Sequence, residues 1–222
     1  MDAILLAAGS SSRLGSDTDK QLHRVNRKPL IIYSAKRLLS HIKIDRLIIA
    51  SRDNGIDALQ EVFKEFSLLQ YCEFVSGGKD RQESVRRSLS AVRSDRVLLH
   101  EGARPLISDA LIERVLTPET ACVTPTVPLP FTVAIGDTFM EKELDRTSLH
   151  NIQLPQAFDT AKLIGAHAHL SSRELSATDD SALIFRMGHS VKFVEGEITN
   201  IKVTYPSDLV LVESIINASG SF

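Results

Sequence analysis

The chain has 222 residues, enough for one domain with a full hydrophobic core. Hydrophobic residues make up 43% of it and charged residues 24%, which is ordinary for a soluble globular enzyme. The formal net charge of -2 argues against a sequence-independent nucleic-acid binder, because such proteins carry a clear basic excess. No apolar run reaches membrane-spanning length and no basic signal region precedes the first apolar run, so we expect a cytoplasmic protein without nucleic-acid or membrane partners.

Apolar runs alternate with amphipathic stretches along the first half of the chain. Runs typical of strands lie at 2–6, 46–50, 72–75 and 96–99. Apolar residues recur at helical spacing in 29–40, 54–66, 81–92 and 109–116. Strands that alternate with helices predict a parallel sheet with helices on both faces.

This alternation breaks between Thr124 and Asn151. Three prolines, a Gly136-Asp137 turn signal and alternating apolar residues predict an antiparallel hairpin that projects from the body. Because an isolated hairpin is only marginally stable, we expect it to pack on a second subunit. The helical pattern returns at 160–170 and 179–187, and a strand at 190–194 precedes a helix at 206–217. The sequence therefore predicts an α/β fold with a Rossmann-like, mostly parallel sheet, forming a single domain over 1–222 with a β-hairpin arm at about 125–150.

A loop rich in small residues follows the first predicted strand, with the sequence Ala7-Ala8-Gly9-Ser10-Ser11-Ser12-Arg13-Leu14-Gly15. The backbone N–H groups of such a loop can cradle phosphates. Its spacing is neither GxGxxG nor a Walker A motif. Arg13 and Lys20 add two cations, which suit a triphosphate and the charge on a leaving pyrophosphate. The alternative interpretation is a flexible surface loop with solvated charges.

Two further segments follow predicted strands at their carboxyl ends, where open α/β sheets bind ligands. The pair Gly77-Gly78, a few residues before Ser84, lets the backbone approach a ligand closely. Glu101 and Arg104 follow the fourth strand, where a carboxylate can hold Mg²⁺ and an arginine can hold a phosphate. Each segment on its own also fits an ordinary turn with solvated or paired charges.

Two segments near the C-terminus also carry polar residues at element boundaries. Ala177-Thr178-Asp179-Asp180-Ser181 fits a helix N-terminus, where carboxylates are favourable. Asn200-Ile201-Lys202-Val203-Thr204 puts Lys202 just before a helix. A lone lysine at such a position is more often solvated than catalytic, so neither segment identifies a site by itself.

Taken together and in this order, these segments resemble the 2-C-methyl-D-erythritol 4-phosphate cytidylyltransferases of isoprenoid synthesis. The related ribitol-5-phosphate cytidylyltransferases share the layout. The matching pieces run from Ile4 to Leu209, and the run from Asn200 to Thr204 is nearly verbatim. The resemblance implies a nucleotidyltransferase-type fold, an enzyme that joins CMP from CTP to a small polyol phosphate and releases pyrophosphate, and a homodimer that forms through the β-arm.

The resemblance also implies roles for individual residues, which we group by the part of the reaction that each would serve. The catalytic residues would be Arg13, Lys20 and Lys202. The nucleotide would be bound by Ala7, Ala8, Gly9, Gly78, Ser84 and Glu101. The acceptor would be bound by Arg104, Arg146 and Thr178, with Arg146 reaching the pocket of a partner subunit. Glu101 would also hold the divalent cation, Mg²⁺.

Three residues depart from the family pattern. Glu101 stands where the family usually has Asp, which keeps the charge but moves it by one methylene. Leu154 stands where a threonine would bind the substrate phosphate, and the neighbouring Gln153 is a candidate to replace it. Lys79 stands where the family often has an acidic residue. The match is therefore firmer in the phosphate loop than in the acceptor pocket.

Several functions remain open at this point. The acceptor could be another polyol phosphate such as ribitol 5-phosphate, since the features described above are common to both subfamilies. A sugar-1-phosphate nucleotidylyltransferase that uses another base is disfavoured by the short chain and by the run around Lys202. A homologue that binds nucleotide without catalysis is kept open by Glu101 and Leu154. A purely structural role is disfavoured because the cations lie on loops after strands.

Overall fold

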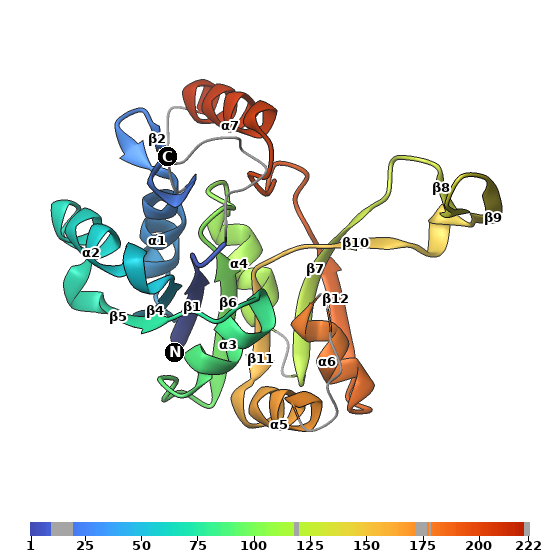
Figure 1. The fold of residues 1–222 in the computed structure, drawn as a ribbon, viewed down its shortest axis with the longest axis horizontal. Coiled ribbons are helices and arrows are strands. Elements are labelled where there is room, and N and C mark those ends of the chain that lie inside the picture. Colours follow the sequence, from blue (N-terminus) through green and yellow to red (C-terminus); the bar gives the residue numbers. More distant parts are fainter. Residues whose placement is uncertain (10–19, 118–119, 172–176, 178, 220–222) are drawn as a thin grey trace.

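The structure is a computed structural model that describes residues 1–9, 20–117, 120–171, 177 and 179–219 (Figure 1). In these residues the main sheet has eight strands: β1 (Asp2–Leu6), β4 (Arg46–Ser51), β5 (Cys72–Ser76), β6 (Arg96–Glu101), β7 (Cys122–Pro128), β10 (His150–Ile152), β11 (Gln156–Asp159) and β12 (Val191–Glu195). Two strand pairs lie outside it: β2 (Arg24–Val25) with β3 (Lys28–Pro29), and β8 (Val133–Gly136) with β9 (Met140–Leu144). The α-helices are α1 (Leu30–Ser40), α2 (Ile56–Glu65), α3 (Arg81–Leu89), α4 (Asp109–Leu116), α5 (Thr160–Ser171), α6 (Asp180–Arg186) and α7 (Pro206–Ser219).

The predicted α/β fold with a mostly parallel sheet is confirmed. Strands β5, β4, β1 and β6 are parallel neighbours, and β12 runs parallel to β7. Strand β11 lies between β6 and β7 and is antiparallel to both, and β10 pairs antiparallel with the end of β7. The sheet is therefore mixed on the β7 side, which the alternation of predicted strands and helices did not indicate.

Strand β7 corrects the expected extent of the arm. The stretch from Thr124 onward was expected to belong to the hairpin because it contains prolines. Instead Cys122–Pro128 is a strand of the main sheet, and its register with β12 runs from Cys122 to Thr126. Pro125 is tolerated because it lies at a gap in the ladder on the other side of β7, where the pairing passes from β11, at Cys122 and Val123, to β10, at Thr126 to Pro128.

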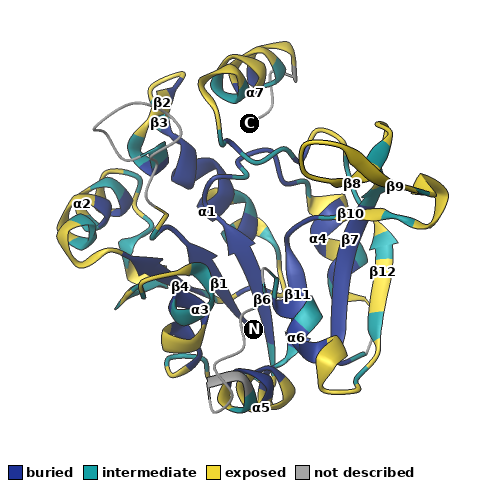
Figure 2. Cartoon of the chain, turned by 45° about the vertical axis from the view of Figure 1, so that its right-hand side comes forward, coloured by how far each residue is buried: buried dark blue, intermediate teal, exposed yellow. Residues whose placement is uncertain are grey.

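Both faces of the sheet are covered by helices, as Figure 2 shows for the dark central strands. Along β1, Ala3 and Leu5 face one cluster of buried side chains, and Ile4 and Leu6 face the other. The first cluster includes buried residues of α1, α2 and α4, and the second includes those of α3, α5 and α6. The period-2 alternation of a strand thus produces two core layers from one apolar run.

A smaller third cluster positions the C-terminal part of the chain. Val212 and Ile216 of α7 pack with Leu30 and Tyr33 at the start of α1. The segment before α7 is tied to the end of the sheet, because the Val203 amide donates to the Ala103 carbonyl at 2.8 Å. This packing brings the 200–204 segment against the loop that follows β6.

The hairpin β8–β9 extends away from the body, as predicted (Figure 1). Its apolar side chains are largely exposed: Phe131 is 76% exposed, Phe139 82% and Met140 71%. In the part of the chain that the structure describes, no helix has both the length and the apolar character needed to cross a bilayer.

Candidate active site

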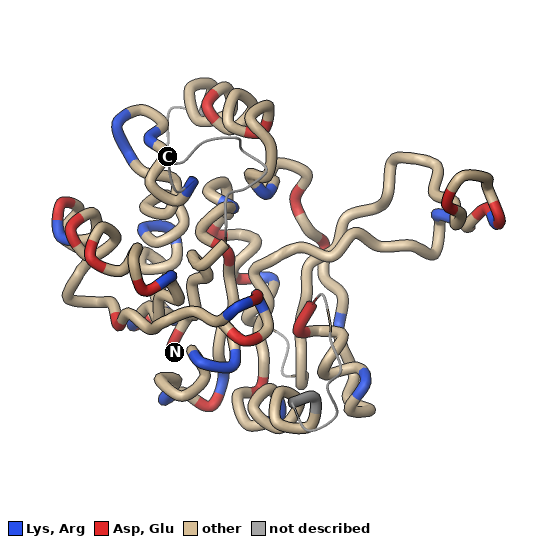
Figure 3. Tube along the Cα trace, in the orientation of Figure 1, with Lys and Arg blue, Asp and Glu red and all other residues tan. Residues whose placement is uncertain are grey.

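A cavity of about 520 Å³ opens at the carboxyl ends of β1, β4, β5 and β6. This is the edge at which parallel sheets present ligands. The residues that line it are Leu6, Ala8, Gly9, Lys20, Gln21, Arg52, Gly78, Lys79, Asp80, Arg81, Ser84, Glu101, Ala103 and Lys202. Lys and Arg are spread over the whole fold in Figure 3. Five of them line this cavity: Lys20, Arg52, Lys79, Arg81 and Lys202.

The floor of the cavity is formed by close contact between the loops after β1 and β5. A side chain at Gly77 would come within 2.6 Å of the Ala8 Cβ and 3.1 Å of the Ser51 carbonyl, so only glycine fits there. The Gly77 amide donates to that same carbonyl at 2.6 Å. Gly77 is therefore needed for one loop to pack on the other, which brings Ala8 and Gly78 into one cavity.

Ser84 fixes the shape of the glycine loop. Its hydroxyl donates to the Asp80 carbonyl at 2.8 Å and accepts from the Gly78 amide at 3.0 Å. The hydroxyl proton is used within the loop, so the remaining lone pair can only accept a hydrogen bond from a ligand. Next to Ser84 the cavity therefore favours a ligand group that donates a hydrogen bond.

Glu101 lies at the end of β6 and is surrounded by cations. Its Oε1 lies 2.7 Å from Lys202 Nζ and 3.7 Å from Arg81 Nε, and its Oε2 lies 3.3 Å from Arg104 Nε. Burial alone would raise the pKa of this carboxyl, but the charges of Lys202 and Arg104 outweigh that effect and lower the pKa to about 2. The carboxylate is therefore ionised at neutral pH.

Lys20 approaches the same region from η2 (Lys20–Leu22), the 3-10 turn before β2. Its ammonium group donates to the Val203 carbonyl at 3.3 Å. Lys20 and Lys202 thus reach the cavity from segments far apart in sequence. Arg13, the other cation expected in this loop, lies outside the described residues.

A second cavity of about 330 Å³ adjoins the first and shares Arg81, Glu101 and Lys202 with it. Its remaining lining residues are Arg104, His150, Asn151, Ile152, Leu154 and Asp179. Two joined cavities that share a carboxylate and two cations can hold two phosphate-bearing ligands side by side.

Gln153 does not take the place of the threonine that Leu154 replaces. Its side-chain amide donates to the Glu197 carbonyl at 2.9 Å and accepts from the Glu197 amide at 3.1 Å. Gln153 is buried in these contacts and is absent from the lining of both cavities. Successive residues of an extended segment point to opposite sides, so Leu154 faces the second cavity and Gln153 faces away from it.

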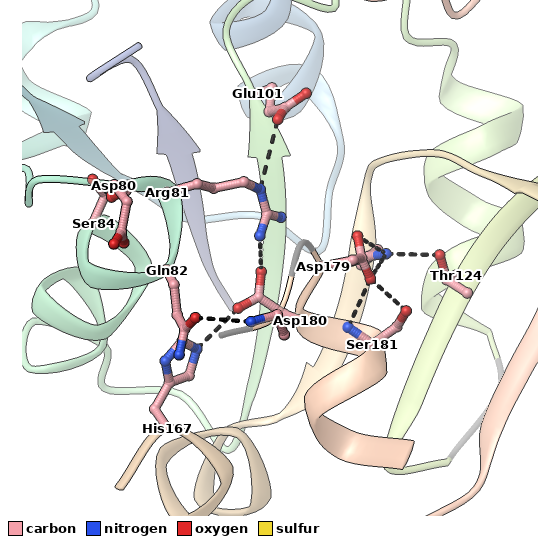
Figure 4. A network of polar contacts seen from close by, with 12 residues as sticks. Asp80, Arg81, Gln82, Ser84, Glu101, Thr124, His167, Asp179, Asp180 and Ser181 are labelled. Carbon is pink, nitrogen blue, oxygen red and sulfur yellow. Dashed lines mark hydrogen bonds and ion pairs between the residues drawn. The ribbon is translucent and has the colours of Figure 1, made fainter. Parts of the chain in front are cut away.

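Arg81 is a site residue that sequence reasoning did not select. It opens α3, and its guanidinium lies between Glu101 and Asp180 (Figure 4). A cation in the first turn opposes the helix dipole, so its position was a usable signal of function. Asp180, at the start of α6, also lies 2.9 Å from His167 Nε2.

Asp179 was expected only as a helix cap. It is the N-cap of α6, where its carboxylate accepts from the Ser181 amide at 2.8 Å. It also accepts from Gln156 Nε2 at 3.0 Å, and it lines the second cavity. Thr178, the neighbour expected to bind the acceptor, lies outside the described residues.

Two other expected residues lie apart from the joined cavities. Ala7 is buried, its amide donates to the Ala50 carbonyl at 2.8 Å, and it is not a lining residue. Arg146 lies in η5 (Arg146–Ser148), the turn after β9, and lines a separate cavity of about 340 Å³ at the base of the arm. Its guanidinium donates to the Pro130 carbonyl at 2.8 Å.

The described residues contain no group of three or more His, Cys, Asp or Glu side chains arranged for a metal ion. Glu101 is nevertheless ionised and borders both cavities. Mg²⁺ in phosphate-transfer sites is usually held by one or two carboxylates together with substrate phosphates. Glu101 therefore fits as a single protein ligand in a metal site that the substrate completes.

Comparisons with known proteins agree on one family. The family model for 2-C-methyl-D-erythritol 4-phosphate cytidylyltransferase matches residues 1–218. Proteins of that name from Clostridium tetani and Clostridium beijerinckii are 34% and 35% identical to this chain, covering 96% and 97% of it and 89% and 98% of their own lengths. The crystal structure of 4-diphosphocytidyl-2C-methyl-D-erythritol synthase from Anaerococcus prevotii superposes with a TM-score of 0.85 at 25% identity, covering 97% of this chain and 95% of that one. The chain belongs to the 2-C-methyl-D-erythritol 4-phosphate cytidylyltransferase family.

Proposed function

We propose that this protein transfers CMP from CTP to 2-C-methyl-D-erythritol 4-phosphate, giving the CDP-alcohol and pyrophosphate for isoprenoid precursor synthesis. The observation that carries the proposal is the pair of joined cavities that share Arg81, Glu101 and Lys202. The larger cavity has room and cations for a nucleoside triphosphate. The smaller one would hold the acceptor, with its phosphate at the junction.

The reaction needs positioning and charge neutralisation more than proton transfer. An oxygen of the acceptor phosphate attacks the α-phosphorus of CTP, and the bond to the leaving pyrophosphate breaks. A phosphate monoester is largely ionised near neutral pH, so no strong general base is required. Lys20 and Lys202 would stabilise the negative charge on the transferred and leaving groups.

The preference for cytosine would come from Ser84. Its free lone pair can accept from the exocyclic amino group of cytosine, whereas uracil has a carbonyl oxygen at that position. Two acceptors that face each other repel. We therefore assign Ser84 a role in base selection in addition to its role in shaping the loop.

Mg²⁺ is the proposed cofactor, with Glu101 as its protein ligand. When bound, such an ion neutralises phosphate charge and holds the phosphates in a reactive arrangement. Lys202 and Arg104, which pair with Glu101, would then be available to substrate phosphates. The protein itself contributes the orientation of these side chains.

Methylerythritol 4-phosphate is favoured over ribitol 5-phosphate by the apolar part of the second cavity. Ile152 and Leu154 line it, among residues that are otherwise mostly polar. A branched acceptor with a methyl group can contact this apolar wall, whereas an unbranched polyol places hydroxyl groups there. Ribitol 5-phosphate is the second candidate, and a binding-only homologue is the third.

A homodimer through the arm is the proposed assembly. Exposed aromatic side chains at Phe131 and Phe139 are costly in water and suit burial against another chain. Arg146, which is outside the joined cavities of its own chain, would contribute to the acceptor pocket of the partner. Both cysteines are free thiols, which supports a reducing compartment such as the cytoplasm.

A pyrophosphate-release assay tests the proposed function. Purified protein is incubated with CTP and Mg²⁺ and with each acceptor in parallel. Release with methylerythritol 4-phosphate alone supports the proposal, and release with ribitol 5-phosphate alone selects the second candidate. CTP binding by calorimetry without release from either acceptor would favour a binding-only homologue.

A further inference from the structure

Arg81 occupies the junction between the two cavities. It is one of three residues that line both, together with Glu101 and Lys202. In the proposed reaction the acceptor phosphate and the α-phosphate of CTP meet at such a junction. A cation there is close to the group that moves from one ligand to the other.

The guanidinium is held in place by anions on two sides. Nη1 makes a very close ion pair with Asp180 Oδ2, and Nε lies 3.7 Å from Glu101 Oε1 (Figure 4). The Asp180 side chain is only 1% exposed, and its other oxygen lies 2.9 Å from His167 Nε2. A carboxylate fixed on one side by a histidine leaves its partner little freedom to rotate.

The third nitrogen of this guanidinium has no hydrogen-bond partner. Arg81 Nη2 is buried, and none of the described residues accepts from it. A buried donor is rarely left unpaired, and such a group calls for a partner from outside the protein. Because Arg81 lines both cavities, a phosphate oxygen at their junction would supply that partner.

The balance of charge at the junction also favours an anion. The lining of the joined cavities has three carboxylates, Asp80, Glu101 and Asp179, against six Lys or Arg side chains: Lys20, Arg52, Lys79, Arg81, Arg104 and Lys202. The excess positive charge is spread over the two cavities, and Arg81 lies where they meet. A transferred phosphoryl group, whose charge is greatest during the reaction, would be stabilised there.

We propose that Arg81 is a catalytic residue whose Nη2 donates to a non-bridging oxygen of the transferred α-phosphoryl group, and that Asp180 positions it. The inference rests on the proposed function. Arg81 stays protonated throughout: the acceptor oxygen forms the new bond to phosphorus, and pyrophosphate leaves with the electron pair of the broken bond. A contact that strengthens as this charge develops lowers the barrier more than it aids CTP binding.

The competing explanation is that Arg81 only neutralises Asp180 within the fold. The double variant R81M/D180N separates the two explanations, because it removes both charges and leaves no buried charge unpaired. We expect it to fold, to bind CTP with a Kd within about threefold of wild type, and to lose kcat by about 100-fold or more. Thermal unfolding and calorimetry with CTP alone provide the folding and binding measurements. A folded double variant with wild-type kcat overturns the proposal.

Chemical rescue provides a second readout. In R81A/D180N, added guanidinium chloride at millimolar concentration is expected to restore part of kcat, while equal sodium chloride does not. The matched control is R86M, which removes an exposed cation from the same helix outside both cavities and is expected to keep wild-type kcat. If guanidinium chloride and sodium chloride have the same effect on kcat in a variant that still binds CTP, the proposed contact between Arg81 and the substrate is contradicted.

The positioning role of Asp180 has its own test. If Asp180 acts through Arg81, the losses of kcat in D180N and R81M are not additive in the double variant. Fully additive losses would show that Asp180 acts elsewhere. Wild-type protein that releases no pyrophosphate with any acceptor defeats the proposed function itself, whereas an active wild type with an active R81M/D180N defeats only the role of Arg81.

Discussion

Lys202 Nζ lies 2.7 Å from Glu101 Oε1, across 101 positions of sequence. This ion pair joins the segment before α7 to the end of β6 and lies on the border of both cavities. It holds a lysine that would otherwise be mobile at the point where two phosphates would meet. The pair therefore organises the site before substrate arrives.

Replacement of Lys20 tests the phosphate-binding role of the first cavity. Lys20→Ala is expected to lower kcat by about 100-fold or more, because it removes a cation that lines the cavity proposed to bind the triphosphate. Lys64→Ala, at an exposed position of α2, is the matched control and should keep wild-type turnover. Steady-state pyrophosphate release measures both, with circular dichroism as the folding check. Wild-type turnover in Lys20→Ala would exclude the role.

The low pKa of Glu101 predicts a pH dependence of stability. Its folded pKa of about 2 is below the ordinary value of 4.5, so ionised Glu101 stabilises the fold above pH 4.5. This contribution is lost as the pH falls from 4.5 through 2, and the shift corresponds to about 3 kcal/mol at most. Urea unfolding between pH 7 and pH 2.5 measures it. Glu101→Gln should show a shallower decline, and an identical decline in both proteins would contradict the assignment.

Ser84 is expected to contribute to the choice of base. Ser84→Ala removes the acceptor proposed for the cytosine amino group, so the ratio of kcat/KM for CTP over UTP should fall by about tenfold. Ser90→Ala, which removes an exposed hydroxyl from the end of the same helix, should leave the ratio unchanged. An unchanged ratio in Ser84→Ala would assign the serine to loop shape alone.

Leu154 offers a test of the acceptor pocket. Leu154→Thr introduces a hydroxyl that can bind the substrate phosphate, and we expect the KM for the acceptor to fall by up to about tenfold. The same change is expected to reduce stability, because Leu154 packs in the cluster beneath α3, α5 and α6. Leu154→Val, which keeps the apolar character, separates the two effects. If the KM for the acceptor falls in both Leu154→Thr and Leu154→Val, the cause is the smaller side chain and not the new hydroxyl.

Substitutions on the exposed surface of the arm test whether the arm forms the dimer. Phe139→Asp should shift the protein toward monomer in size-exclusion chromatography with light scattering, because an exposed aromatic side chain is replaced by a charge. Arg146→Ala should keep the dimer but lower activity. A stable monomer with full wild-type activity would remove the proposed function of the arm.

Local sequence patterns determined much of the fold. The runs that became β1, β4 and β6 are short and largely apolar, and helices such as α4 have apolar residues at regular spacing. The ends of the parallel strands and the segments after them carry Lys20, Gly78 and Glu101, which the topology brings to one edge of the sheet. These features could be predicted from residues that are close together in sequence. The spacing of apolar residues identifies the strands and helices, and ligands bind at the carboxyl ends of parallel strands.

Only the tertiary structure decided the remaining features. Strands β7 and β11 form through pairing with distant segments, and their prolines and polar residues gave no local strand signal. The contact of Arg81 with Asp180 joins residues 99 positions apart, and the orientation of Gln153 away from the second cavity follows from its bonds to Glu197. Such contacts depend on how the elements pack, because a side chain's partners are set by the approach of distant backbone and not by its own neighbours in sequence.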